Sequence, residues 1–380
     1  MKRNSLIGLA IAAAVVVVLA VMVAQQRTSE TKPAGGGGLM FEGLIGKVNS
    51  VASIEVNNGD EVFTITRKAQ SWGVAEKSDY PVQFDLVKKT IMGVAELELI
   101  AAKTKDPDRH GALLLNTPEA EEGGSIGLVL ADDTGATLAS LLVGKTVRAG
   151  GERRYVRRRN EDQTWLGSGG IDVGKTPLDW IEIILTQIRH DRVRKITLSH
   201  PDGDHAVLER MEQSDFDFTY MEIPDGMRAL APSKLNSVGG ALAFLSMKDV
   251  RLASDMNFDP TDASVTRFET WDGIVVTVST IETDEKKWAR FEVEFDESLV
   301  LETVPSAASD VDESAEGTEE VEDPHAVARE EAGTISTRTR GWAYALDDHK
   351  MDQLRKRSED FIEPDLPDEA DGSEDLTTNQ

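Results

Sequence analysis

Two stretches of this sequence align with each other and predict a duplicated fold. Placing ITLSHPDGDHAVLER (196–210) beneath IEVNNGDEVFTITR (54–67) matches a strand, a Gly-Asp turn, a second strand and a closing arginine. Polar turn residues between two alternating runs are typical of a β-hairpin, and three further strand-like segments follow each copy. The pattern predicts an α+β fold with two tandem, similar, β-rich units at 48–175 and 193–303, each an antiparallel sheet with a packed helix.

Helices are expected where apolar residues recur at spacings of three and four. The first unit shows this spacing from 84 to 97, and the second has a shorter helical stretch at 235–244. Between the units, Thr176 as N-cap and Pro177 at the first helical position predict a connecting helix over 176–192. A final strand and helix are expected within 336–362, the strand at 342–346.

Residues 5–24 form an uncharged apolar run, SLIGLAIAAAVVVVLAVMVA, whose length of about 20 residues suits a helix that spans a bilayer. Lys2 and Arg3 precede the run, so residues 1–4 are expected as a cytoplasmic stub and the bulk of the chain outside. The alternative is a cleaved signal peptide, which keeps the compartment and removes the anchor. Residues 25–47, polar and then glycine-rich, are expected as a flexible tether.

Composition excludes several classes of function. The chain has no cysteine, which rules out disulfides, thiolate catalysis and cysteine-based zinc sites. A formal net charge of −27 argues against binding nucleic acid or anionic lipid surfaces. Acidic residues concentrate late in the chain, and disorder is expected for an acidic insertion at 304–335 and an acidic tail at 363–380.

The segment GGIDVGKT (169–176) has the spacing of a phosphate-binding loop. Such a loop requires a buried strand before it and a helix N-terminus whose amides point at the phosphates. Here the preceding residues are a polar Gly-Ser-Gly, and Pro177 follows at once. The segment is therefore interpreted as a glycine-rich linker ending in a helix cap, with no nucleotide or other cofactor expected.

The segment LSHPDGDH (198–205) resembles the signature of metallo-β-lactamase-fold hydrolases, which deliver histidine and aspartate ligands to a zinc pair. The residues in question are His200, Asp202, Asp204 and His205, and zinc held there would generate hydroxide near neutral pH. The first repeat places Asn57 to Asp60 at the same turn, which gives the turn without metal ligands. A hairpin turn is therefore preferred, and no catalytic, cofactor-binding or metal-binding residue is assigned.

The basic run RRYVRRR (153–159) lies on an expected strand. It is interpreted as a solvated face or a partner of the acidic segments, with a binding function as the alternative.

The segments TPLDWIEIILTQIRHDRVRKITLSHPDG (176–203) and GWAYALDDHKMDQLRKRSEDFI (341–362), together with the anchor, resemble the domain of unknown function 4340 family. That resemblance implies a single-anchor bacterial inner-membrane protein found alongside ABC-type transport components, and it carries no catalytic residues. The expected function is a non-catalytic accessory subunit of an ABC-transporter-type complex. The alternatives are a zinc hydrolase that uses the 200–205 segment and a cell-envelope scaffold protein.

Overall fold

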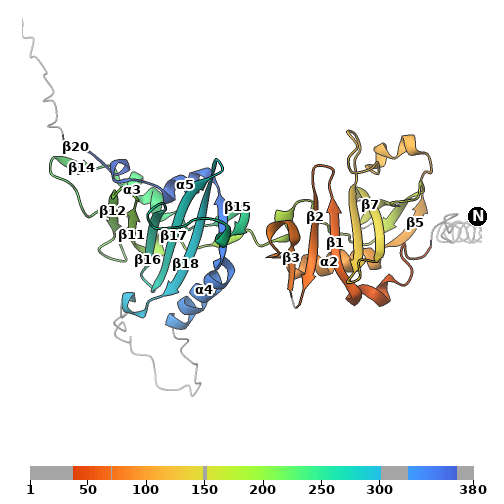
Figure 1. The fold of residues 1–380 in the computed structure, drawn as a ribbon, viewed down its shortest axis with the longest axis horizontal. Helices are drawn as coiled ribbons and strands as arrows, with labels where there is room; N and C mark the ends of the chain where they lie inside the picture. Colours follow the sequence, from red (N-terminus) through yellow and green to blue (C-terminus); the bar gives the residue numbers. More distant parts are fainter. Residues whose placement is uncertain (1–36, 70, 149–151, 301–323, 366–380) are drawn as a thin grey trace, which may run out of the picture. The chain divides into compact units, whose positions relative to one another are not determined.

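The computed structural model describes residues 37–69, 71–148, 152–300 and 324–365 (Figure 1). These residues form two compact units that divide between Ile181 and Glu182. The expected anchor at 5–24 lies outside the described residues, as do residues 304–323 and 366–380. Within the described part of the chain, no helix combines the length and the apolar character that crossing a membrane needs.

The first unit is built on one antiparallel sheet with the order β4-β3-β2-β1-β6-β7-β8-β9-β5. Its strands alternate apolar and polar residues, so that side chains such as Ile54 and Val56 in β1 are completely buried. The strands are β1 (Val51–Asn57), β2 (Val62–Lys68), β3 (Ser71–Val74), β4 (Tyr80–Pro81), β5 (Glu98–Ala102), β6 (Ile126–Asp132), β7 (Thr137–Val147), β8 (Arg153–Arg158) and β9 (Thr164–Ser168).

Helix α2 (Phe84–Ala95) forms where the apolar spacing predicts it. Val87, Ile91 and Val94 are buried along one side of the helix. Five short 3₁₀ helices complete the described part of the first unit: η1 (Leu44–Ser50), η2 (Ala75–Lys77), η3 (Pro107–Arg109), η4 (Gly111–Leu113) and η5 (Pro177–Trp180).

The second unit contains a sheet with the order β10-β15-β19-β18-β17-β16-β11-β12-β13, and every pair in it is antiparallel. Its strands are β10 (Ile184–Thr186), β11 (Val193–Ser199), β12 (His205–Glu209), β13 (Thr219–Tyr220), β15 (Leu245–Leu252), β16 (Ser264–Thr270), β17 (Ile274–Thr283), β18 (Lys286–Phe295) and β19 (Trp342–Leu346). A separate pair joins β14 (Met227–Ala229) to β20 (Ile362–Pro364). The two large antiparallel sheets confirm the predicted β-rich class.

The helices of the second unit are shorter than its longest strands except for α4. They are α3 (Pro232–Gly239), α4 (Pro324–Thr339) and α5 (Asp348–Leu354), with the 3₁₀ helices η6 (His190–Arg192), η7 (Ala253–Asp255), η8 (Glu297–Leu299) and η9 (Ser358–Asp360). Helix α4 packs on β18 (Figure 1).

The strand orders of the two sheets correspond once β4 and β10 are set aside. In both sheets the first strand of the hairpin also pairs with a later strand of its unit, β1 with β6 and β11 with β16. The registers agree as well: Val51 faces Asp132 and Val193 faces Thr270, and each strand pair has an irregularity directly after that position. A register irregularity that recurs at the same position in both strand pairs indicates that the two positions are structurally equivalent. The hairpin alignment in the sequence therefore describes equivalent positions in the two sheets.

Four parts of the chain differ from the predictions. The acidic tail at 363–380 was predicted to be disordered, but Ile362–Pro364 form β20, which pairs with β14. Residues 176–192 do not form the predicted connecting helix; they form η5, β10 and η6. The apolar residues there are buried, Trp180 and Leu185 completely, but the chain carries them in a short turn and a strand. A buried strand and a buried helix both need apolar side chains, and periodicity alone does not separate them.

The acidic insertion predicted at 304–335 was wrong for its described part, because helix α4 begins at Pro324. Ala328, Ala332 and Ile335 are buried at helical spacing, so small side chains let the helix approach the sheet.

The predicted tether at 25–47 was wrong from Gly37 onward. Met40 is buried, and its N–H donates to the carbonyl of Leu97 at 2.8 Å. The apolar residues that follow Gly38 therefore pack this part of the chain against the first unit.

Candidate functional site

The segment with metal-ligand spacing forms the loop of the β11–β12 hairpin. The His200 N–H donates to the Asp204 carbonyl at 2.9 Å, and the Gly203 N–H donates to the His200 carbonyl at 3.0 Å. Gly203 has a φ of +89°, a conformation that favours glycine. The Asp202 carboxylate accepts from the Asp204 N–H at 3.1 Å. Its own backbone and side chains therefore close this loop.

Both ring nitrogens of His200 have partners in the second unit. Nε2 lies 2.9 Å from the carbonyl oxygen of Lys356, and Nδ1 lies 2.9 Å from the hydroxyl of Ser264. A carbonyl oxygen only accepts, so Nε2 carries the hydrogen and, in the neutral ring, Nδ1 accepts from the hydroxyl. This arrangement uses the lone pair that a metal would need.

The two aspartates of the loop bind the segment that follows α5. Arg357 forms ion pairs with Asp202 and Asp204, and the Ser358 N–H donates to Asp204 at 3.2 Å. The Asp204 N–H and the Arg357 guanidinium hold the pKa of Asp202 below its ordinary value. The 200–205 loop thus has a structural role, because its side chains bind residues 356–358 and hold them against the sheet.

His205 contacts a different neighbour. Its exposed ring lies 3.2 Å from the Ser199 hydroxyl, across the first pair of the hairpin. Among the described residues, no group of three or more histidine, aspartate or glutamate side chains could hold a metal ion. The structure therefore brings Asp202 and Asp204 together on Arg357, and it engages His200 and His205 elsewhere.

The equivalent turn of the first unit is closed by different hydrogen bonds. The Asn58 side-chain oxygen accepts from the N–H groups of Asp60 and Glu61, both at 2.9 Å. Each unit thus uses a polar side chain to close the corresponding hairpin, as asparagine and aspartate commonly do in turns.

The second half of the glycine-rich segment binds a carboxylate of its own chain. One oxygen of Asp179 accepts from the N–H groups of Lys175 and Thr176, at 2.8 and 2.9 Å. These are the amides that would face a phosphate in a phosphate-binding loop. Only the four-residue helix η5 follows them, and Pro177 is its first residue. The segment caps a short helix, as its sequence predicts.

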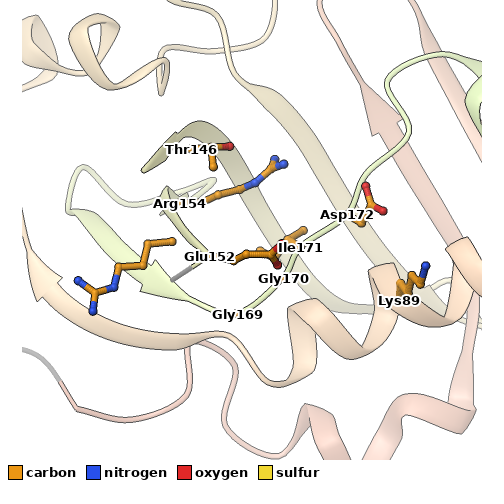
Figure 2. A pocket seen from close by; sticks show the side chains of 9 residues that line it. Lys89, Thr146, Glu152, Arg154, Gly169, Gly170, Ile171 and Asp172 are labelled. Atoms are coloured by element: carbon orange, nitrogen blue, oxygen red, sulfur yellow. The ribbon is translucent and has the colours of Figure 1, made fainter. Parts of the chain in front are cut away.

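The first half of the same segment lines a cavity of about 480 Å³ in the first unit, which is open to solvent because the side chains of Lys89, Thr146, Glu152 and Asp172 are exposed (Figure 2). Sites for small molecules commonly measure about 300–1,000 Å³. The cavity is lined by Lys89 of α2, Thr146 of β7, Glu152 directly before β8, Arg154 of β8, and Asp172. Sequence reasoning missed this group because its members come from four separate segments. The one available signal was the basic run at 153–159.

Close backbone approaches fix the wall of this cavity. A Cβ on Gly93 of α2 would lie 2.5 Å from the carbonyl oxygen of Gly170, so only glycine lets the helix pack this close. The Thr90 hydroxyl donates to the carbonyl of Asp172. The helix therefore sets where the 169–172 stretch runs.

Comparison with known protein families identifies the family to which the chain belongs. Residues 72–270, about half of the chain, match a model described as Domain of unknown function (DUF4340). The chain belongs to the DUF4340 family. The match begins in β3 and ends in β16, so the DUF4340 span takes in parts of both units and confirms the resemblance noted in the sequence. No curated protein matches the chain, and no solved structure does.

Proposed function

We propose that this DUF4340 chain is a non-catalytic accessory subunit that binds an ABC-transporter-type complex. In this proposal residues 5–24 anchor it in the bacterial inner membrane, and the two units lie on the extracytoplasmic side. We also infer that the units arose by tandem duplication, on the basis of their matching strand orders and registers. The internal partners of the 200–205 loop and of Lys175 and Thr176 support a role in binding rather than in catalysis.

The observation that carries the binding role is the exposure of four apolar side chains that lie close together in the sequence, before and after β13. We name this group the 211–223 patch. Its members and their exposed fractions are Met211 (66%), Phe216 (73%), Met221 (41%) and Ile223 (45%). Aromatic residues and methionine are enriched at protein interfaces, and grouped apolar exposure marks such surfaces.

Acidic residues accompany this patch along the chain. Glu212, Asp215, Asp217, Glu222 and Asp225 fall within or directly after it. Carboxylates disfavour anionic lipid headgroups and favour a protein surface with basic residues around an apolar centre. A protein partner therefore suits the patch better than the membrane surface.

A cross-linking pull-down of the full-length anchored protein from its native membranes tests the proposal. We expect transporter subunits to be recovered with the wild-type chain and to be lost with Phe216→Ser. The matched control is Phe244→Ser, because Phe244 belongs to the same unit and is 72% exposed. Recovery of no transporter subunit by the wild-type chain would refute the proposal, as would equal recovery by both variants. Zinc content of the same sample tests the hydrolase alternative.

A further inference from the structure

The basic run of β8 divides into paired and unpaired cations. Arg157 donates to the carbonyls of Leu115 and Glu161, and Arg158 forms an ion pair with Glu161 at 3.1 Å. Arg159 lies 3.8 Å from Glu55. The later half of the run is therefore used within the first unit.

The cations that line the cavity have no such partners. Within the described residues, the side chains of Lys89, Arg153 and Arg154 form no ion pair or hydrogen bond. The carboxylates of Glu152 and Asp172 line the same cavity and are equally without an ionic partner in that part of the chain. Cationic and anionic side chains thus line the same cavity and form no ion pairs with each other.

The arrangement of these side chains separates two faces of the cavity. Arg154 and Thr146 lie together on one side, Asp172 and Lys89 lie on another, and Glu152 lies between them beside Gly170 (Figure 2). A Cβ on Gly170 would lie 2.7 Å from Oε2 of Glu152, so glycine leaves room for this carboxylate. A ligand in the cavity would meet cationic and anionic groups at once.

We propose that this cavity binds a small zwitterion, a molecule that joins an anionic group to an ammonium group. Its anionic group pairs with Arg154 and the Thr146 hydroxyl, and its ammonium group pairs with Glu152 and Asp172. A ligand with a single charge would leave one set of side chains unpaired. The inference does not depend on the proposed transporter partner.

Two sources offer this chemistry, and the probes distinguish them. Triglycine presents the carboxylate and ammonium of a short peptide, whereas glycerophosphoethanolamine presents the phosphate and ammonium of a lipid headgroup. N-acetylglycine carries only the negative charge, and glycinamide carries only the positive one. Isothermal titration of the purified full-length chain in neutral detergent at low salt compares the four probes.

We expect at least one zwitterion to bind and both singly charged probes to bind at least about tenfold more weakly, since each loses charge-assisted hydrogen bonds. Arg154→Gln and Asp172→Asn should each weaken zwitterion binding by a similar factor. Arg159→Gln is the matched control, because it removes an arginine of the same run that does not line the cavity. Its affinity should equal that of the wild type.

Several results would overturn the inference. These are the absence of binding by both zwitterions, equal binding by a singly charged probe, and unchanged affinity in both cavity variants. Thermal unfolding of each variant establishes that it is folded, and if Arg154→Gln does not fold, Asp172→Asn alone decides.

Discussion

Replacing His200 by alanine separates a structural role of the 200–205 loop from a metal-binding one. The ring makes hydrogen bonds to the Ser264 hydroxyl and the Lys356 carbonyl, both at 2.9 Å. Each is worth about 1 kcal/mol net, so His200→Ala should lower the free energy of unfolding of the second unit by about 2 kcal/mol. For a unit of this size that corresponds to a drop of about 4–8 °C in Tm.

His205→Ala is the matched control from the same loop. Its ring is exposed and contacts only Ser199, at 3.2 Å, so the change should stay within about 0.5 kcal/mol. Thermal unfolding of the full-length variants, with and without EDTA, measures both effects. A metal site would require both histidines and would make the wild-type Tm fall with EDTA. Equal losses of Tm in the two variants, or a wild-type Tm that EDTA lowers, would refute the structural role of the 200–205 loop.

Three further predictions concern the second unit. Gly333→Ala should raise the free energy of unfolding by about 0.5–1 kcal/mol, because Gly333 is an exposed residue inside α4 with nothing within 4 Å of an added Cβ; an unchanged or lower Tm would contradict this. Ala332→Asp should cost more than about 3 kcal/mol, since Ala332 is 2% exposed and the carboxylate would be buried unpaired; a normal Tm would show that α4 does not pack there. Burial, and then the Arg210 guanidinium, lower the pKa of His190, so the unfolded chain takes up a proton below pH about 6.5 that the folded chain does not. Stability should therefore fall between pH 7 and pH 5, and His190→Asn should reduce that fall in a series of Tm measurements; an identical pH profile would exclude His190 as its source.

Local patterns predicted the hairpins because strand alternation and turn residues act over short distances. The alignment of 54–67 with 196–210 placed equivalent strands, and the register and its irregularity agree in both sheets. Helix α2 was predictable for the same reason, since the apolar spacing that indicates it lies within a segment of 12 residues.

The features that were missed depend on distant neighbours. In α4 the buried positions are two alanines, a threonine and a single large apolar residue, Ile335, so the apolar periodicity that reveals a helix is weak. In 176–192 the opposite holds: strong apolar spacing predicts a helix, but Ile184 and Thr186 pair with β15. The cavity was not predictable because Lys89, Arg154 and Asp172 come to line one cavity only through the packing of α2 against the residues after β9.

Strand β19 has a consequence for how the chain is made. It comes from residues 342–346, yet it lies between β15 and β18 inside the second sheet. Until that segment has left the ribosome and reached its place, both neighbours expose unpaired edges, which are sites of aggregation. The second unit is therefore completed late in synthesis, whereas every strand of the first sheet is available by residue 168. A chain that stops before Trp342 would keep one intact unit and carry a second that is open to holdase chaperones and proteases.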